Sequence, residues 1–153
     1  MRCAVLGDPI EHSLSPALHR AAYEALGIDW TYDAVRVPTG GLPGFLDGLD
    51  GSWRGLSLTM PLKREVMPLL ISRDTWAERS GAANTVLLDA DGRHGLNTDV
   101  PGAVAAIREV TDAPVDRALV LGGGATAASV VLALAELGCG AVTLLVRDPG
   151  RAQ

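Results

Sequence analysis

The sequence has little of what marks several classes of protein. Its 153 residues contain no run of like charge and only two cysteines. The net charge is −5 and the arginines are scattered, so there is no basic stripe of the kind that binds nucleic acid. The longest apolar stretch, residues 127–137, is too short to span a bilayer and is interrupted by Ser129 and Glu136. The composition therefore predicts neither a nucleic acid nor a membrane as a partner.

The two cysteines and the start of the chain bear on the compartment. Cys3 and Cys139 lie far apart in apolar runs, which favours reduced core residues over a disulfide or a metal site. Met1 leads directly into a strand-like pattern, so we expect no signal segment. We therefore expect a cytoplasmic protein that binds no metal.

Strand and helix patterns alternate along the first 110 residues. Ser15 is expected to cap a helix in which Pro16 takes the first position and which Gly27 ends. Asp91 and Gly92 form a turn signal between two strands. The expected strands are 2–6, 30–37, 54–58, 84–89 and 93–96, and the expected helices are 15–26, 40–49, 62–70, 74–80 and 100–110. This alternation predicts an α/β fold with a mainly parallel sheet.

The pattern changes after residues 111–116, whose composition is that of a linker. A strand at 117–121, a helix at 126–137 and a strand at 141–146 make one right-handed βαβ unit. Between the first strand and the helix, GGGATA fits G-x-G-x-x-A. Such a turn lets backbone approach a pyrophosphate, whose charge the free N–H groups at the helix start receive. The motif favours a dinucleotide site, and a glycine turn that binds nothing is the alternative.

The residues after the last strand bear on the choice of dinucleotide. Arg147 and Arg151 are one helical turn apart and could both face the 2′-phosphate of NADP. Asp148 is the complication, because it could accept the ribose hydroxyls of NAD or simply cap a helix. The two arginines favour NADP.

Lys63 is the only lysine beside twelve arginines. Arginine stays protonated in a protein, whereas lysine can release and regain its proton. In SLTMPLK, residues 57–63, Pro61 holds Thr59 and Lys63 at a strand-to-helix junction. Lys63 is therefore a candidate for proton transfer, and a surface lysine without a function is the alternative.

Other polar residues stand at the ends of expected elements. Ser13 and Ser15 are two residues apart before a helix start, so that both hydroxyls suit a carboxylate, although Ser15 could merely cap the helix. Asn84 begins a strand and Asp99 begins a helix. A turn residue and an N-cap are their respective alternative roles. His12 and His19 are expected to be structural.

Taken together in order and spacing, these motifs are specific. G-x-P-I-x-H-S-x-S-P, T-x-P-x-K, G-A-x-N-T, G-x-N-T-D and the glycine-rich turn resemble the shikimate dehydrogenase family over essentially the whole chain. The resemblance implies a substrate-binding domain at residues 1–112. It also implies the first βαβ unit of an incomplete, NADP-binding Rossmann-type domain at residues 113–153.

The resemblance also assigns roles to residues. It implies that Lys63 and Asp99 form the catalytic pair. It implies that shikimate is bound by Ser13, Ser15, Thr59, Asn84 and Asp99. It implies that NADP is bound by Gly122, Gly123, Gly124, Ala125, Thr126, Arg147 and Arg151.

The activity so implied is the reversible reduction of 3-dehydroshikimate to shikimate by NADPH, in aromatic amino-acid biosynthesis. The expected state is a monomer or homodimer. The sequence departs from the family at Ser57, where Asn is common, and at Asp148, where Thr is usual. A relative that also oxidises quinate or uses NAD, and a chain that binds substrate without catalysis, are the alternatives.

Overall fold

The fold is described from a computed structural model in which residues 1–148 and 150 are placed. The strands are β1 (Arg2–Gly7), β2 (Thr31–Arg36), β3 (Trp53–Leu58), β4 (Ser72–Arg73), β5 (Thr85–Asp89), β6 (Gly92–Leu96), β7 (Arg117–Leu121) and β8 (Ala141–Leu145). The helices are α1 (Ser15–Leu26), α2 (Leu42–Asp47), α3 (Leu62–Glu65), the 3₁₀ turn η1 (Met67–Leu69), α4 (Thr75–Ser80), α5 (Asp99–Val110) and α6 (Ala125–Glu136).

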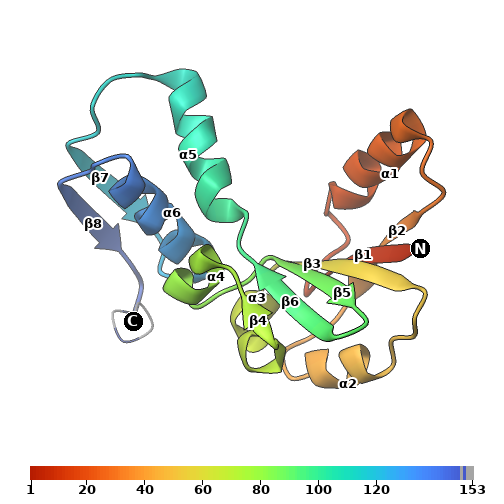
Figure 1. Ribbon diagram of the computed structural model, residues 1–153. Helices are drawn as coiled ribbons and strands as arrows, with labels where there is room; N and C mark the ends of the chain where they lie inside the picture. The colour runs from red at the N-terminus through yellow and green to blue at the C-terminus, as the bar shows by residue number, and fades with distance from the viewer. Residues whose placement is uncertain (149, 151–153) are drawn as a thin grey trace.

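The first six strands form one sheet in the order β2-β1-β3-β5-β6-β4. The pairs β2–β1, β1–β3 and β4–β6 are parallel, whereas β5 runs antiparallel to both of its neighbours. The sheet is thus mainly parallel, which confirms the predicted fold class. Figure 1 shows this sheet with α1 at its upper right, α2 below it, and β7, β8 and α6 on the left side of the molecule.

β1 lies inside the sheet and is buried on both faces. Ala4 and Leu6 join the larger hydrophobic cluster with residues of α2 and α3, whereas Cys3 and Val5 join a second cluster with residues near α1. Successive side chains of a strand point to opposite faces, so a continuous apolar run supplies both clusters. This burial fixes β1, and with it the loop from Asp8 to Leu14 that follows.

A close approach of backbone occurs where β1 ends. The Asp8 N–H donates to the Met60 carbonyl at 2.9 Å, and the Thr59 N–H donates to the Leu6 carbonyl at 2.9 Å. A Cβ at Gly7 would overlap Cγ2 of Thr59 and lie 2.9 Å from the Met60 oxygen. Gly7 therefore lets the end of β1 and the segment after β3 lie against each other.

The second unit contains β7, α6 and β8. β7 and β8 pair in parallel, with Leu121 opposite Leu145. α6 packs against β7 and also against α4 and α5 of the first unit. Arg79 of α4 forms an ion pair with Glu136 of α6 at 3.1 Å. Within the described residues, no helix is long and apolar enough to cross a membrane.

Several expected element boundaries were wrong. The helix expected at 62–70 stops at Glu65, because Pro68 cannot donate to a continuing helix, and a 3₁₀ turn follows. The helix expected at 40–49 is confined to Leu42–Asp47, and the short strand β4 was not expected. Ser15 is not the N-cap of α1: Leu14 takes that place without a side-chain bond, and Ser15 is the first helical residue.

One face of the small sheet is uncovered in the described structure. Leu119, Leu121 and Leu145 share that face and are 62%, 73% and 62% exposed. A cluster of exposed apolar side chains on an open sheet favours association with another chain.

We expect the 153-residue chain to self-associate through this unit and Leu121→Lys to weaken the association. Leu26→Lys is the matched control, because Leu26 is equally exposed on α1, away from the small sheet. Sedimentation velocity over a concentration series measures both variants. If Leu121→Lys associates as strongly as the unmodified chain, this face is not the surface of self-association.

Candidate active site

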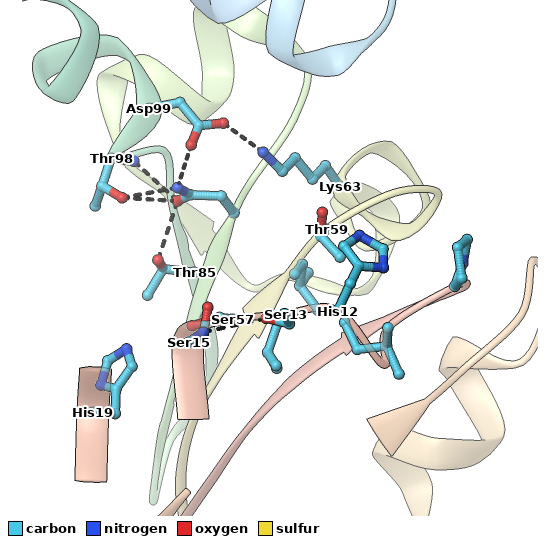
Figure 2. A pocket seen from close by; sticks show the side chains of 15 residues that line it. His12, Ser13, Ser15, His19, Ser57, Thr59, Lys63, Thr85, Thr98 and Asp99 are labelled. Carbon is cyan, nitrogen blue, oxygen red and sulfur yellow. Dashed lines mark hydrogen bonds and ion pairs between the residues drawn. The ribbon is translucent and has the colours of Figure 1, made fainter. Parts of the chain in front are cut away.

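All five predicted substrate residues line one cavity in the first unit. The cavity has a volume of about 470 Å³, and a small polar ligand would fit in it. Its walls come from the loop before α1, the end of β3, and the starts of β5, α3 and α5. The predicted residues among its lining are Ser13, Ser15, Thr59, Lys63, Asn84 and Asp99. Figure 2 shows the side chains of Ser13, Ser15, Thr59, Lys63 and Asp99 around the cavity.

Lys63 and Asp99 form an ion pair on the cavity wall. Nζ of Lys63 lies 2.6 Å from Oδ2 of Asp99, and the two side chains are 13% and 25% exposed. Figure 2 shows the two groups directed at each other. Asp99 is the first residue of α5, where the helix dipole favours a carboxylate. Thr98, and not Asp99, is the N-cap, so the carboxylate is available to Lys63 and to a ligand.

Asn84 holds the other oxygen of the same carboxylate. Its Nδ2 donates to Oδ1 of Asp99 at 2.8 Å and to Oγ1 of Thr98 at 2.8 Å. Its Oδ1 accepts from the Thr98 N–H at 3.0 Å and from the Thr85 hydroxyl at 3.1 Å. Asn84 thus fixes the orientation of Asp99, which an ordinary turn residue would not do.

The serines lie at the other end of the cavity. The Ser15 N–H donates to Oγ of Ser13 at 3.3 Å. Ser13 thus bonds to a free N–H group at the start of α1, the helix that Ser15 was expected to cap. The Ser15 hydroxyl has no capping bond and lines the cavity. Both hydroxyls therefore stand beside the N-terminus of α1, in an arrangement that suits an anion.

Two aromatic side chains support this end of the cavity. The Tyr32 hydroxyl donates to Oγ of Ser57 at 2.6 Å, and the His19 ring stacks on Tyr32 with centroids 4.0 Å apart. Burial raises the pKa of Tyr32 and lowers the pKa of His19. Both shifts favour the uncharged form of the side chain, so the hydroxyls and the helix N-terminus are the groups here that suit the charge of an anion.

A second cavity, of about 490 Å³, lies beside the glycine-rich turn. Gly122, Gly124, Ala125 and Thr126 line it on one side, and Thr59 and Lys63 line it on the other. Gly124 is the N-cap of α6 without a side-chain bond, and a Cβ there would meet nothing within 4 Å. The first N–H groups of α6 are therefore open to a ligand, as a bound pyrophosphate requires.

The remaining predicted dinucleotide residues lie around this turn. Gly123 lines a neighbouring hollow against α4. The Gly122 N–H donates to the Leu145 carbonyl at 2.9 Å, which brings the end of β8 to the turn. Arg147 follows two residues later and is exposed. Arg151 lies outside the described residues.

The chain matches a family model and several known proteins. The family model of the shikimate dehydrogenase substrate binding domain matches residues 5–86, more than half of the chain. The chain belongs to the shikimate dehydrogenase family.

Individual family members match beyond that domain. The NADP(+) shikimate dehydrogenase of Thermus thermophilus is 42% identical over 153 residues, and that of Moorella thermoacetica is 40% identical over 151 residues. A crystal structure of the Thermus thermophilus enzyme in complex with NADP(H) and shikimate superposes with a TM-score of 0.90 over 99% of this chain and 58% of that one. The chain spans about half the length of the curated relatives it matches, 57% and 51% for these two.

Some cavity residues were not predicted as binding residues. Thr85 and Thr98 line the cavity and bond to Asn84, and both belong to family motifs, G-A-x-N-T and G-x-N-T-D. Their position directly beside Asn84 and Asp99 was the available signal. His12 and His19, expected to be structural, also line the cavity.

Proposed function

We propose that this chain supplies the substrate site and the first part of the NADP site of a shikimate dehydrogenase. The reaction is the reversible reduction of 3-dehydroshikimate to shikimate by NADPH. The observation that carries the proposal is the position of Lys63, which lines both the polar cavity and the cavity of the glycine-rich turn. A proton-transfer group is needed where the two ligands meet.

NADPH supplies the hydride, and the protein positions the substrate and manages one proton. As the substrate carbonyl becomes an alkoxide, the Lys63 ammonium stabilises the developing charge and donates the proton. In the reverse direction Lys63 accepts the proton of the alcohol, and Asp99 holds the ammonium at 2.6 Å. Asn84 keeps Asp99 in place.

Binding specificity comes from the polar lining. The hydroxyls of Ser13 and Ser15 and the N–H groups at the start of α1 donate to the carboxylate, and Thr59, Asn84 and Asp99 bond to ring hydroxyls. A ligand without matching groups would form fewer bonds with the hydroxyls of Ser13, Ser15 and Thr59, which lowers its affinity relative to shikimate.

The test uses a chimera, here called the completed enzyme, in which the C-terminal part of the Thermus thermophilus relative follows Gln153. We expect it to oxidise NADPH in the presence of 3-dehydroshikimate. The 153-residue chain alone is expected to bind shikimate weakly and to show no NADPH-dependent turnover. A completed enzyme that folds, binds both ligands and does not turn over would contradict the proposal.

The preference for NADP is proposed to depend on Arg147. A charged hydrogen bond to the 2′-phosphate contributes roughly 1.5–3 kcal/mol, so Arg147→Ala should reduce the NADPH-over-NADH preference of the completed enzyme by about tenfold or more. Arg117→Ala is the control, because Arg117 is exposed at the other end of the small sheet. Equal rates with NADH and NADPH before substitution would favour the alternative in which Asp148 accepts the ribose hydroxyls.

The compartment and the partners belong to the same proposal. Cys3 and Cys139 are both free, which suits the reducing cytoplasm. The expected partners are shikimate, 3-dehydroshikimate and NADP, with no nucleic acid, and the expected state is a monomer or homodimer. The pathway is aromatic amino-acid biosynthesis.

A further inference from the structure

A buried amide joins the two units of the molecule. Asn97 lies between β6 and α5 and is 1% exposed. Its Nδ2 has three acceptors within reach: Oγ of Ser80 at 2.8 Å, the Ala82 carbonyl at 3.0 Å and Oγ of Ser129 at 3.0 Å. Ser80 and Ala82 belong to the first unit, whereas Ser129 belongs to α6 and is fully buried. A single side chain therefore crosses from the first unit to the helix that follows the glycine-rich turn.

The same amide also contacts the proposed catalytic carboxylate residue. The side-chain Oδ1 of Asn97 accepts the N–H of Asp99 at 3.0 Å, and the backbone N–H of Asn97 donates to the carboxylate of Asp74, the N-cap of α4. Every polar group of the Asn97 side chain is thus bonded in a buried place, where leaving one unpaired is costly. The other direct polar link that α6 makes to the first unit is the Arg79–Glu136 pair, which is exposed and contributes little.

We propose that Asn97 is a positioning residue that sets the distance between the glycine-rich turn and the Lys63–Asp99 pair. Through Ser129 it fixes α6, whose first residues carry the proposed NADP site. Through the Asp99 N–H it fixes the start of α5. The inference rests on the proposed function. Hydride transfer depends on the separation of two bound ligands, and a displacement of about 1 Å can cost up to about a hundredfold in rate.

The chain offers a matched pair of variants for the test. Ser129→Ala and Ser80→Ala each remove one buried hydroxyl that accepts from the same Asn97 Nδ2, but only Ser129 lies in the second unit. Asn97→Ala would be more direct, yet it removes all of these bonds at once and could prevent folding. Because both serines are buried, both variants are expected to lose stability. Only a link between the two units would make Ser129→Ala affect turnover more than Ser80→Ala does.

In the completed enzyme we expect Ser129→Ala to lower kcat by about tenfold and to change the KM for shikimate by less than about twofold. Ser80→Ala is expected to leave kcat within about twofold, even if it lowers the melting temperature as much. Equal kcat for the two variants, whether both are lowered or both unchanged, would overturn the proposal.

A second measurement does not need activity. In the ¹⁵N-labelled 153-residue chain, residual dipolar couplings from the six-stranded sheet and from α6 should fit one common alignment. We expect Ser129→Ala to break that agreement and Ser80→Ala to preserve it. An inactive completed enzyme would count against the proposed function alone, whereas a common alignment retained in Ser129→Ala would count against Asn97 as the link.

Discussion

Lys63→Ala should lower the turnover of the completed enzyme by at least about a hundredfold, the usual scale for general acid–base catalysis. The reason is that Lys63 is the titratable group on the wall shared by the two cavities, and its ammonium is paired with Asp99 at 2.6 Å. The affinity for shikimate should change little, because the carboxylate and most hydroxyl contacts are made by other residues. Steady-state kinetics with 3-dehydroshikimate and NADPH measures the loss.

Lys63→Arg distinguishes two roles of the side chain, its positive charge and its ability to transfer a proton. Arginine keeps the positive charge beside Asp99 but cannot release a proton in a protein. We therefore expect Lys63→Arg to be nearly as inactive as Lys63→Ala. Turnover within a few-fold of the unmodified enzyme in either variant would mean that Lys63 does not transfer the proton.

Gly7→Ala is expected to damage both stability and binding. The added methyl would overlap Cγ2 of Thr59 and press on the Met60 carbonyl, both of which belong to a packed segment. Overpacking of this kind costs about 1–3 kcal/mol, or several degrees in melting temperature for a chain of this size. Because Thr59 lines both cavities, its displacement should also weaken shikimate binding.

Gly44→Ala is the matched control for Gly7→Ala. Gly44 lies within α2, and a Cβ there meets nothing within 4 Å. Alanine in a helix is favoured over glycine by about 0.5–1 kcal/mol, so this variant should be slightly more stable and should bind normally. A melting curve and a shikimate titration of both variants decide the matter. Unaltered stability and binding in Gly7→Ala would show that the segment after β3 can move aside freely.

The sequence predicted the elements with strong local signals. The continuous apolar run of β1, the Asp91-Gly92 turn and the glycines at 122–124 are each local signals, and the corresponding elements are present. Boundaries were less predictable where two effects compete. α3 stops before Pro68 although apolar residues continue to Leu70, because the missing N–H outweighs the apolar pattern.

The arrangement of the site needed the tertiary structure. Serine is a favoured N-cap residue, so Ser15 was expected to cap α1. In the structure the N–H of Ser15 instead donates to the hydroxyl of Ser13, and this depends on the path of the loop before the helix. Asn97 was not a candidate in the sequence, since its importance depends on Ser129, 32 residues away. Contacts of that kind leave no periodic pattern. The Lys63–Asp99 pair spans 36 residues and was expected only from the family motifs.

We propose that residues 5–99 form a shikimate site with Lys63 and Asp99 on its wall. The most direct test is a titration of shikimate into the ¹⁵N-labelled 153-residue chain, followed by amide chemical shifts. Saturable shifts confined to Ser13, Ser15, Asn84, Asp99 and their neighbours, and abolished by a Ser13→Ala, Ser15→Ala double variant that remains folded, are the predicted result. Shifts that cluster elsewhere, or an unchanged spectrum of a folded chain at saturating shikimate, would contradict the account.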